Sequence, residues 1–264
     1  MKIALISDIH GNVLALQEVL ADADRVGVDL IFNLGDTLGG PLASARTADL
    51  LMHRDIAMIA GNHERQLLTL PPDKLNRSDA CTASEISSAH RNWLASAPET
   101  CWLSDEVFAC HGTPSSDLHY WLETITDDFG QHGSVGMRAA SQSEVLQGLG
   151  HGAHVDQASL IVCGHTHVPR VGHVQVLGSE GKSREITIVN PGSVGLPAYD
   201  DVHPFKHYVE TASPHARYAI VEKTTHGWHV DLRCVAYDFE PMARMAEHRN
   251  RPDWAIALRT GRMT

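Results

Sequence analysis

The stretch that decides the fold is Leu160-Ile161-Val162-Cys163-Gly164-His165-Thr166-His167. Its apolar half is typical of a buried strand, and that strand ends at the glycine. Side chains two residues apart in an extended chain point to the same side, so His165 and His167 can face one cavity. Neutral imidazole is a common ligand of divalent transition metals. Because the chain has 18 histidines, the pair is informative only if other strand ends repeat it.

Four other apolar segments end in metal-competent side chains. The strands predicted over 2–7, 29–34, 55–60 and 106–110 are followed by polar residues, most of them beside a glycine. In open α/β sheets, sites lie outside the carboxyl ends of the strands. Together the five strand ends supply seven candidate ligands: Asp8, His10, Asp36, Asn62, His111, His165 and His167. Oxygen and imidazole ligands without cysteine are typical of sites for two ions of the manganese, iron or zinc type.

Strands and helices alternate through the first part of the chain. Helical spacing predicts helices over 12–26, from Pro41 to about residue 52, over 64–70 and over 78–95. This alternation is typical of a parallel sheet with right-handed crossovers. We therefore predict an α/β fold in a single domain over 1–264, because no linker divides the chain.

The second part of the chain is less regular. Residues 113–157 follow His111 directly, and we expect a cap-like insertion there that selects the substrate, with a helix over 134–150. A simple surface excursion is the alternative. Hairpins are predicted from 170–177 with 184–189, around a turn at 178–183, and from 216–222 with 228–237. A helical tail is predicted at about 240–264.

The ordered motifs Asp-x-His, Gly-Asp, Gly-Asn-His-Glu, His-Gly and Gly-His-x-His resemble those of the calcineurin-like metallophosphoesterases. The resemblance implies a two-sheet β-sandwich of mixed strands, flanked by helices on both faces. It also implies two metal sites that share Asp36. The first would be held by Asp8, His10, Asp36 and His167, and the second by Asp36, Asn62, His111 and His165.

One departure from the family pattern concerns the catalytic histidine. The histidine next to Asn62 is His63, our candidate general acid for the leaving group. A packed histidine without a catalytic role is the alternative. Many relatives read Gly-Asp-x-x-Asp, in which the second aspartate orients this histidine, whereas Gly39 stands at that position here. Glu64 or another carboxylate must therefore supply the role.

The implied chemistry is hydrolysis of phosphate esters. Two metals ~3.5–4 Å apart share a hydroxide that attacks phosphorus, and they neutralise the developing charge. We expect manganese, with iron, zinc or nickel as alternatives. The aromatic group at His119, Tyr120 and Trp121 follows a ligand closely and is a candidate to stack against the substrate, with core packing as the alternative.

Composition narrows the choice of substrate. The net charge of −11 argues against an extended nucleic-acid surface, and no apolar run approaches the ~18 residues of a membrane span. The five cysteines are typical of reduced thiols, and with no signal peptide expected ahead of Asp8 they predict a cytoplasmic location. A homo-oligomer is compatible with the sequence.

We therefore predict a hydrolase of small phosphate mono- or diesters. A serine/threonine protein phosphatase or a dinucleoside polyphosphate hydrolase would share the same core chemistry. A non-enzymatic scaffold is disfavoured, because all seven candidate ligands and His63 are present.

Overall fold

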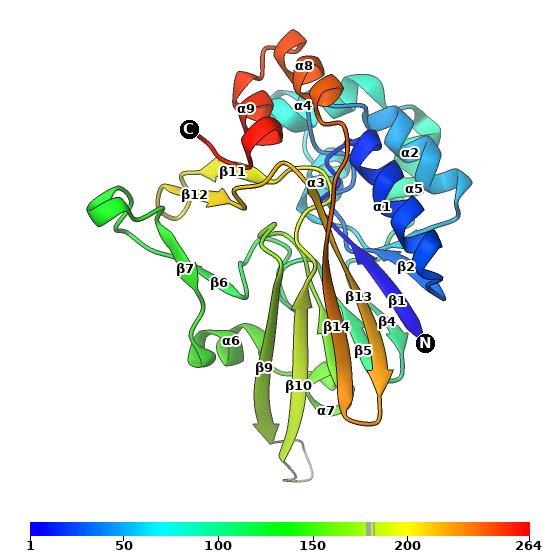
Figure 1. The fold of residues 1–264 in the computed structure, drawn as a ribbon, viewed down its shortest axis with the longest axis vertical. Helices are drawn as coiled ribbons and strands as arrows, with labels where there is room; N and C mark the ends of the chain where they lie inside the picture. The colour runs from blue at the N-terminus through cyan, green and yellow to red at the C-terminus, as the bar shows by residue number, and fades with distance from the viewer. Residues whose placement is uncertain (178–180, 182) are drawn as a thin grey trace.

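The computed structural model describes residues 1–177, 181 and 183–264, and its architecture is shown in Figure 1. Two five-stranded sheets pack together. The first has the order β14-β13-β1-β2-β3, and the second has the order β4-β5-β8-β10-β9. The first contains β1 (Lys2–Ile6), β2 (Leu30–Asn33), β3 (Ala57–Met58), β13 (Ala216–Thr224) and β14 (Gly227–Val235). The second contains β4 (Cys101–Ser104), β5 (Val107–Ala109), β8 (Leu160–Val162), β9 (Arg170–Leu177) and β10 (Ser183–Asn190).

Helices and two small hairpins complete the fold. The helices near the first sheet and the cavity are α1 (Val13–Val26), α2 (Ser44–His53), α3 (Asn62–Thr69), α4 (Arg77–Glu85), α5 (Ser88–Ala95), α8 (Glu240–His248) and α9 (Pro252–Thr260). Those after β5 are α6 (Gln142–Leu149) and α7 (Ala153–Gln157), with short 3₁₀ turns at Pro72–Lys74 and Gln131–Gly133. The small hairpins are β6 (Glu123–Ile125) with β7 (Met137–Ala139), and β11 (Ala198–Asp201) with β12 (His207–Glu210).

Alternating side chains explain the layers. Ile3 and Leu5 of β1 face the second sheet, whereas Ala4 and Ile6 point to the other side and pack with α1. In the second sheet, Phe108 and its outward-facing neighbours pack against residues of α6 and α7. Helices therefore cover both outer faces, as Figure 1 shows with α1, α2 and α5 on one side and α6 and α7 on the other. The predicted α/β sandwich is confirmed.

The strands that carry the motifs run parallel within each sheet. β1, β2 and β3 are parallel neighbours, and β5, β8 and β10 are parallel neighbours. Both predicted hairpins form, since β9 pairs with β10 and β13 with β14 in antiparallel register. Residues 178–180 and 182 of the first predicted turn lie outside the described residues. The parallel arrangement brings the carboxyl ends of the motif strands to one side of the sandwich.

Two predicted helices differ from the structure. The helix expected over 78–95 is two helices, because Ile86 is extended and the Ser87 hydroxyl accepts the His90 backbone N–H at 3.2 Å to begin α5. The helix expected over 134–150 begins only at Gln142, since Gly136 has a φ of 74° and the residues after it form β7. The C-terminal tail, predicted to be helical, consists of α8 and α9.

The β11–β12 hairpin had no sequence signal that we could use. It matters for the site, because its residues face the cavity described below. Among the described residues, no helix is long and apolar enough to cross a membrane.

Candidate metal centre and active site

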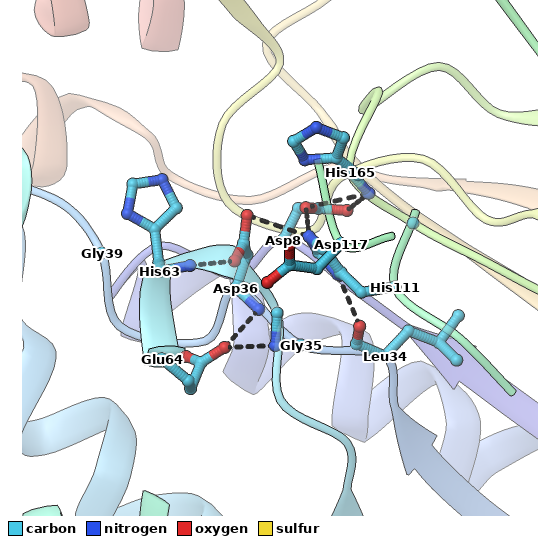
Figure 2. Close-up of polar contacts among 12 residues, drawn as sticks. Asp8, Leu34, Gly35, Asp36, Gly39, His63, Glu64, His111, Asp117 and His165 are labelled. Atoms are coloured by element: carbon cyan, nitrogen blue, oxygen red, sulfur yellow. Dashed lines mark hydrogen bonds and ion pairs between the residues drawn. The ribbon is translucent and has the colours of Figure 1, made fainter. Parts of the chain in front are cut away.

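The seven candidate ligands converge at the carboxyl ends of the motif strands. Four of them, Asp8, Asp36, His111 and His165, are labelled in Figure 2. The ligand atoms of Asp8, His10 and His167 lie within 4.8 Å of one another. Those of Asp36, His111 and His165 form a second group with the same limit. Asn62 begins α3 and lines the same cavity, as does Asp36. Among the described residues, a third group of His10, Asp36 and His63 meets the same limit. The first two groups contain six of the seven ligands that the resemblance implies.

The tautomers of three histidines are fixed by the backbone. Their Nδ1–H groups donate to main-chain carbonyls: His10 to Gly39 at 2.6 Å, His111 to Leu34 at 2.7 Å and His167 to Leu196 at 2.7 Å. In a neutral imidazole the other nitrogen is then an acceptor. His165 is oriented in the opposite sense, because its Nε2 faces the Leu118 carbonyl at 3.0 Å and leaves Nδ1 free.

The free nitrogens face other acceptors rather than donors. Nε2 of His10 lies 3.1 Å from Nε2 of His167, and Nε2 of His111 lies 3.1 Å from a carboxylate oxygen of Asp36. Within the described part of the chain, Oδ1 of Asn62 is buried and has no hydrogen-bond partner. Lone pairs directed at one another are unfavourable unless a cation or a proton lies between them. The donor set therefore fits divalent metal ions.

Electrostatics at the site favour the same conclusion. Burial lowers the pKa of His10 to about 3 and that of His165 to about 4, so both rings are neutral ligands. Burial also opposes charge on His111, but the Asp36 carboxylate outweighs it and raises the pKa to about 10. Although burial alone would raise them, neighbouring histidines hold the pKa values of Asp8 and Asp36 below the usual range. The carboxylates that attract a proton to His111 would attract a metal ion equally.

Five of the seven candidate ligands sit in left-handed backbone conformations. These are Asp8, His10, Asp36, His165 and His167, with φ between 50° and 70°. Such conformations cost free energy for residues other than glycine and gather at functional sites. Position 61 must be a glycine, because a Cβ on Gly61 would lie 2.3 Å from an Asp36 carboxylate oxygen. The local backbone is therefore shaped to aim side chains into one space.

The Glu64 side chain connects the loop after β2 to the loop after β3 through hydrogen bonds. Its carboxylate is fully buried and accepts the backbone N–H groups of Asp36 at 2.8 Å, Thr37 at 2.9 Å and Gly61 at 2.9 Å. Figure 2 shows the side chain directed at the main chain beside Asp36. Burial raises the pKa of Glu64, and these N–H groups stabilise the ionised form. Glu64 thus holds the loop that carries Asp36, and it does not contact His63 through its carboxylate.

His63 is held by a carboxylate that the sequence did not reveal. Its backbone N–H donates to Asp36, and its Nδ1 lies 2.5 Å from Oδ1 of Asp79, the third residue of α4. The ring is partly exposed and lines the cavity, whereas the Asp79 side chain is fully buried. Burial lowers the pKa of His63, but Asp36 and the Asp79 hydrogen bond together raise it to about 9.

A cavity of about 1130 Å³ opens over these residues. Its floor is the candidate metal centre, and its walls come from three other regions. The segment 113–157 supplies Leu118, His119 and Tyr120, the β11–β12 hairpin supplies Tyr199 and Asp200, and the C-terminal region supplies Arg251 and Trp254. Substrate must therefore enter between elements that lie far apart in the sequence.

The family model of the calcineurin-like phosphoesterase superfamily domain matches residues 1–212. The chain belongs to this superfamily. All seven candidate ligands and His63 lie within the matched residues. The family is metal-dependent, in agreement with the donor set described above. Helices α8 and α9, which lie beyond residue 212, are outside the match although α9 forms part of the cavity wall.

Other comparisons find one similar sequence and two similar folds. An uncharacterized protein of Methanocaldococcus jannaschii is 28% identical over 211 residues, which cover 74% of this chain and 76% of that protein. The structure resembles a metallophosphoesterase from Sphaerobacter thermophilus with a TM-score of 0.66 at 23% identity, over 99% of each chain. It also resembles a hypothetical protein from Pyrococcus horikoshii, with a TM-score of 0.67 at 16% identity over 98% of each chain. The two solved structures share the metallophosphoesterase fold with this chain.

The three aromatic residues proposed to contact substrate separate into two groups in this phosphoesterase. His119 and Tyr120 line the cavity, and the Tyr120 hydroxyl lies 2.5 Å from that of Tyr199 and 3.1 Å from Nε2 of His207. Trp121 is buried in the core, where its indole N–H donates to the Val145 carbonyl at 2.9 Å. Trp121 is therefore a packing residue, because its ring is covered by α6 rather than presented to the cavity.

Sequence reasoning missed several residues around the site. Asp79 supports His63 from a separate helix, and Tyr199 packs its ring edge against His167 with centroids 4.6 Å apart. Trp254 packs against His10 with ring centroids 5.9 Å apart. None of these residues lies in a motif, so the sequence offered no signal that would place them beside the ligands.

Proposed function

We propose that this protein is a hydrolase that uses two divalent transition-metal ions to cleave phosphate mono- or diesters of small molecules. The observation that carries the proposal is the set of facing lone pairs in the centre. Nitrogens of His10, His111 and His167 are directed at other acceptors while their N–H groups are used on the backbone. Such a donor set is suited to metal ions, and phosphoesterase chemistry is the activity of the superfamily.

We assign the candidate ligands to two ions in the way that the family resemblance implies. One ion would take Asp8, His10, Asp36 and His167, and the other would take Asp36, Asn62, His111 and His165. Manganese is our first choice, with iron, zinc and nickel as alternatives, because mixed oxygen and imidazole ligands accept all of them. Ions bound there would lower the pKa of a shared water molecule and offset the negative charge of the phosphoryl oxygens.

The side chains of the protein supply orientation and a proton. His63 adjoins the candidate ligand Asn62 and lines the cavity, so it lies beside any phosphate bound over the centre. We assign it the donation of a proton to the leaving oxygen, whose departure as an alkoxide would otherwise be slow. The Glu64 carboxylate keeps the Asp36 loop in place during this step. The leaving group must then lie on the His63 side of the cavity, near α4.

The cavity walls favour small substrates over folded proteins. The insertion, the β11–β12 hairpin and α9 all rise around the metal centre. A phosphorylated side chain on a folded protein surface would have to pass these walls before reaching His63. A nucleotide or another small ester would fit within about 1130 Å³.

The test is hydrolysis of a phosphomonoester and a phosphodiester of p-nitrophenol. Purified protein is stripped with a chelator and reloaded in turn with manganese, iron, zinc, nickel or magnesium. We expect turnover to return with at least one transition metal, and the preferred ester assigns monoesterase or diesterase activity. Protein shown by elemental analysis to hold two ions, yet inactive on both esters and on nucleotides, would contradict the proposal.

A further inference from the structure

We propose that Asp79 of α4 is the positioning residue for His63, in place of the aspartate that relatives carry at the position of Gly39. The inference rests on the proposed function, since it assigns a partner to the proton donor of that reaction. It concerns a residue outside every motif of the sequence. Asp79 acts through His63 and does not itself line the cavity.

The contact between the two residues is short and well supported. Oδ1 of Asp79 lies 2.5 Å from Nδ1 of His63, and Oδ2 accepts the side-chain N–H of Asn76 at 2.7 Å. Asn76 also caps α4, because its side-chain oxygen Oδ1 accepts the Asp79 backbone N–H at 2.9 Å. Both carboxylate oxygens are therefore occupied, and their geometry is fixed by the first turn of the helix. A buried carboxylate held in this way is suited to orient an imidazole ring.

Gly39 makes this arrangement possible. A Cβ built on Gly39 would lie 2.3 Å from Nδ1 and 2.4 Å from Cγ of His63, so the ring occupies the space that a side chain there would need. An aspartate at position 39 and the observed His63 ring cannot coexist. The carboxylate that contacts the His63 ring therefore comes from α4 and not from the Asp36 loop, and the ring fills the space over the glycine.

Helix α4 is anchored by the short segment that joins α8 to α9. Arg251 donates to the Ser78 hydroxyl at 2.9 Å, Arg77 donates to the Asn250 carbonyl at 3.0 Å, and Arg249 pairs with Glu85 at 3.0 Å. These contacts lie along α4 from its first residue to its last. The two helices that this segment joins lie beyond residue 212, where the family match ends. The segment holds the helix that carries Asp79.

The arrangement has a defined chemical consequence. When Nδ1–H of His63 donates to Asp79, the proton that reaches the leaving oxygen must come from Nε2. Replacing Asp79 by asparagine keeps the volume but removes the charge. To keep its bond with Asn76, the new amide must present its NH₂ group to Nδ1 of His63, which opposes the Nδ1–H that the ring must keep when Nε2 gives up its proton. Asp79→Asn should therefore weaken proton donation without altering the metal ligands.

The first measurement is the dependence of kcat on the leaving group, across aryl phosphate esters from dinitrophenyl to unsubstituted phenyl. A good leaving group needs no proton, whereas a poor one does. We expect Asp79→Asn to slow the phenyl ester ~10–100-fold and the dinitrophenyl ester much less, at unchanged metal content. The matched control is Asp49→Asn, which makes the same change at the surface pair of Asp49 with His90, 3.0 Å apart on α2 and α5. An equal loss for every ester would assign Asp79 a merely structural role and overturn the proposal.

The second measurement does not need activity. In zinc-loaded full-length protein, ¹⁵N–¹H spectra of the imidazoles should show His63 protonated at Nδ1, and Asp79→Asn should shift that signal while those of His10 and His167 stay in place. A wild-type His63 without a proton on Nδ1 would overturn the inference even in an active enzyme. The expected spectrum in a protein inactive on every ester would uphold the Asp79 contact and reject the proposed function instead.

Discussion

The metal side of the cavity and its leaving-group side are built in different ways. On the metal side, every candidate ligand follows the end of a strand within a few residues, and most sit in strained backbone conformations. On the leaving-group side, His63 is supported by a helix that the segment between α8 and α9 holds in place. The geometry of the metal side is set within short sequence motifs, whereas that of the leaving-group side depends on packing between elements far apart in the sequence. Variants on the metal side should therefore lose bound metal together with turnover, whereas variants on the leaving-group side should lose turnover and keep the metal.

The largest effect is expected for Asp36→Asn, on the metal side. Asp36 faces His111 and accepts the His63 backbone N–H, and it is the candidate ligand shared by both ions. An amide in this place removes the charge that would offset the ions, so metal content and turnover should fall together. The loss should exceed the ~10–100-fold that outer contacts of a metal site contribute. Elemental analysis and the ester assay measure it, with the exposed Asp105→Asn as control.

His63→Ala should separate the two sides. The ring is not one of the seven candidate ligands, so the ions should remain while turnover falls by ~10²–10⁴-fold. Elemental analysis of the same preparation used for kinetics measures both quantities, and His53→Ala on α2 is the control. Unchanged turnover would show that His63 is not the proton donor. A loss of metal would show that His63 supports metal binding instead.

Glu64→Gln should act through the metal centre although Glu64 is not a candidate ligand. One carboxylate oxygen accepts two backbone N–H groups and the other accepts a third. An amide must turn its NH₂ group toward at least one of these donors, which loosens the Asp36 loop. We expect metal affinity to fall ~10–100-fold and an excess of metal to restore turnover, with Glu18→Gln on α1 as control. If excess metal does not restore turnover, Glu64 supports the catalytic step at His63 and not metal binding.

The fold and the convergence of the ligands could be predicted because the information is local. A strand followed by a glycine and a polar residue specifies both the sheet and the direction of the side chain, as at Gly61 and Asn62. The parallel order of the strands then brings the ligands together. Each step needs only a few neighbouring residues.

The support of His63 could not be predicted, because it depends on packing. Asp79 lies 16 residues beyond His63, and its place follows from the break at Ile86, the cap at Asn76 and the docking of the segment between α8 and α9. The expected single helix over 78–95 would have hidden that break. Trp121 shows the same limit from the other side, since the sequence left substrate contact and core packing open, and the ring lies in the core against α6.

The smallest effect is expected for Arg77→Gln, on the leaving-group side. Arg77 begins α4 and lines the cavity, and among the described residues its guanidinium has no ion pair. An exposed cation there should attract a leaving group that carries its own negative charge, such as a second phosphate. Loss of the charge should raise KM for such a substrate about 2- to 5-fold at unchanged kcat, and less at high salt. Arg46→Gln, exposed on α2 away from the cavity, is the control. An equal rise in KM for an ester with a neutral leaving group would mean that Arg77 acts on the fold of α4 and not on the charge of the substrate.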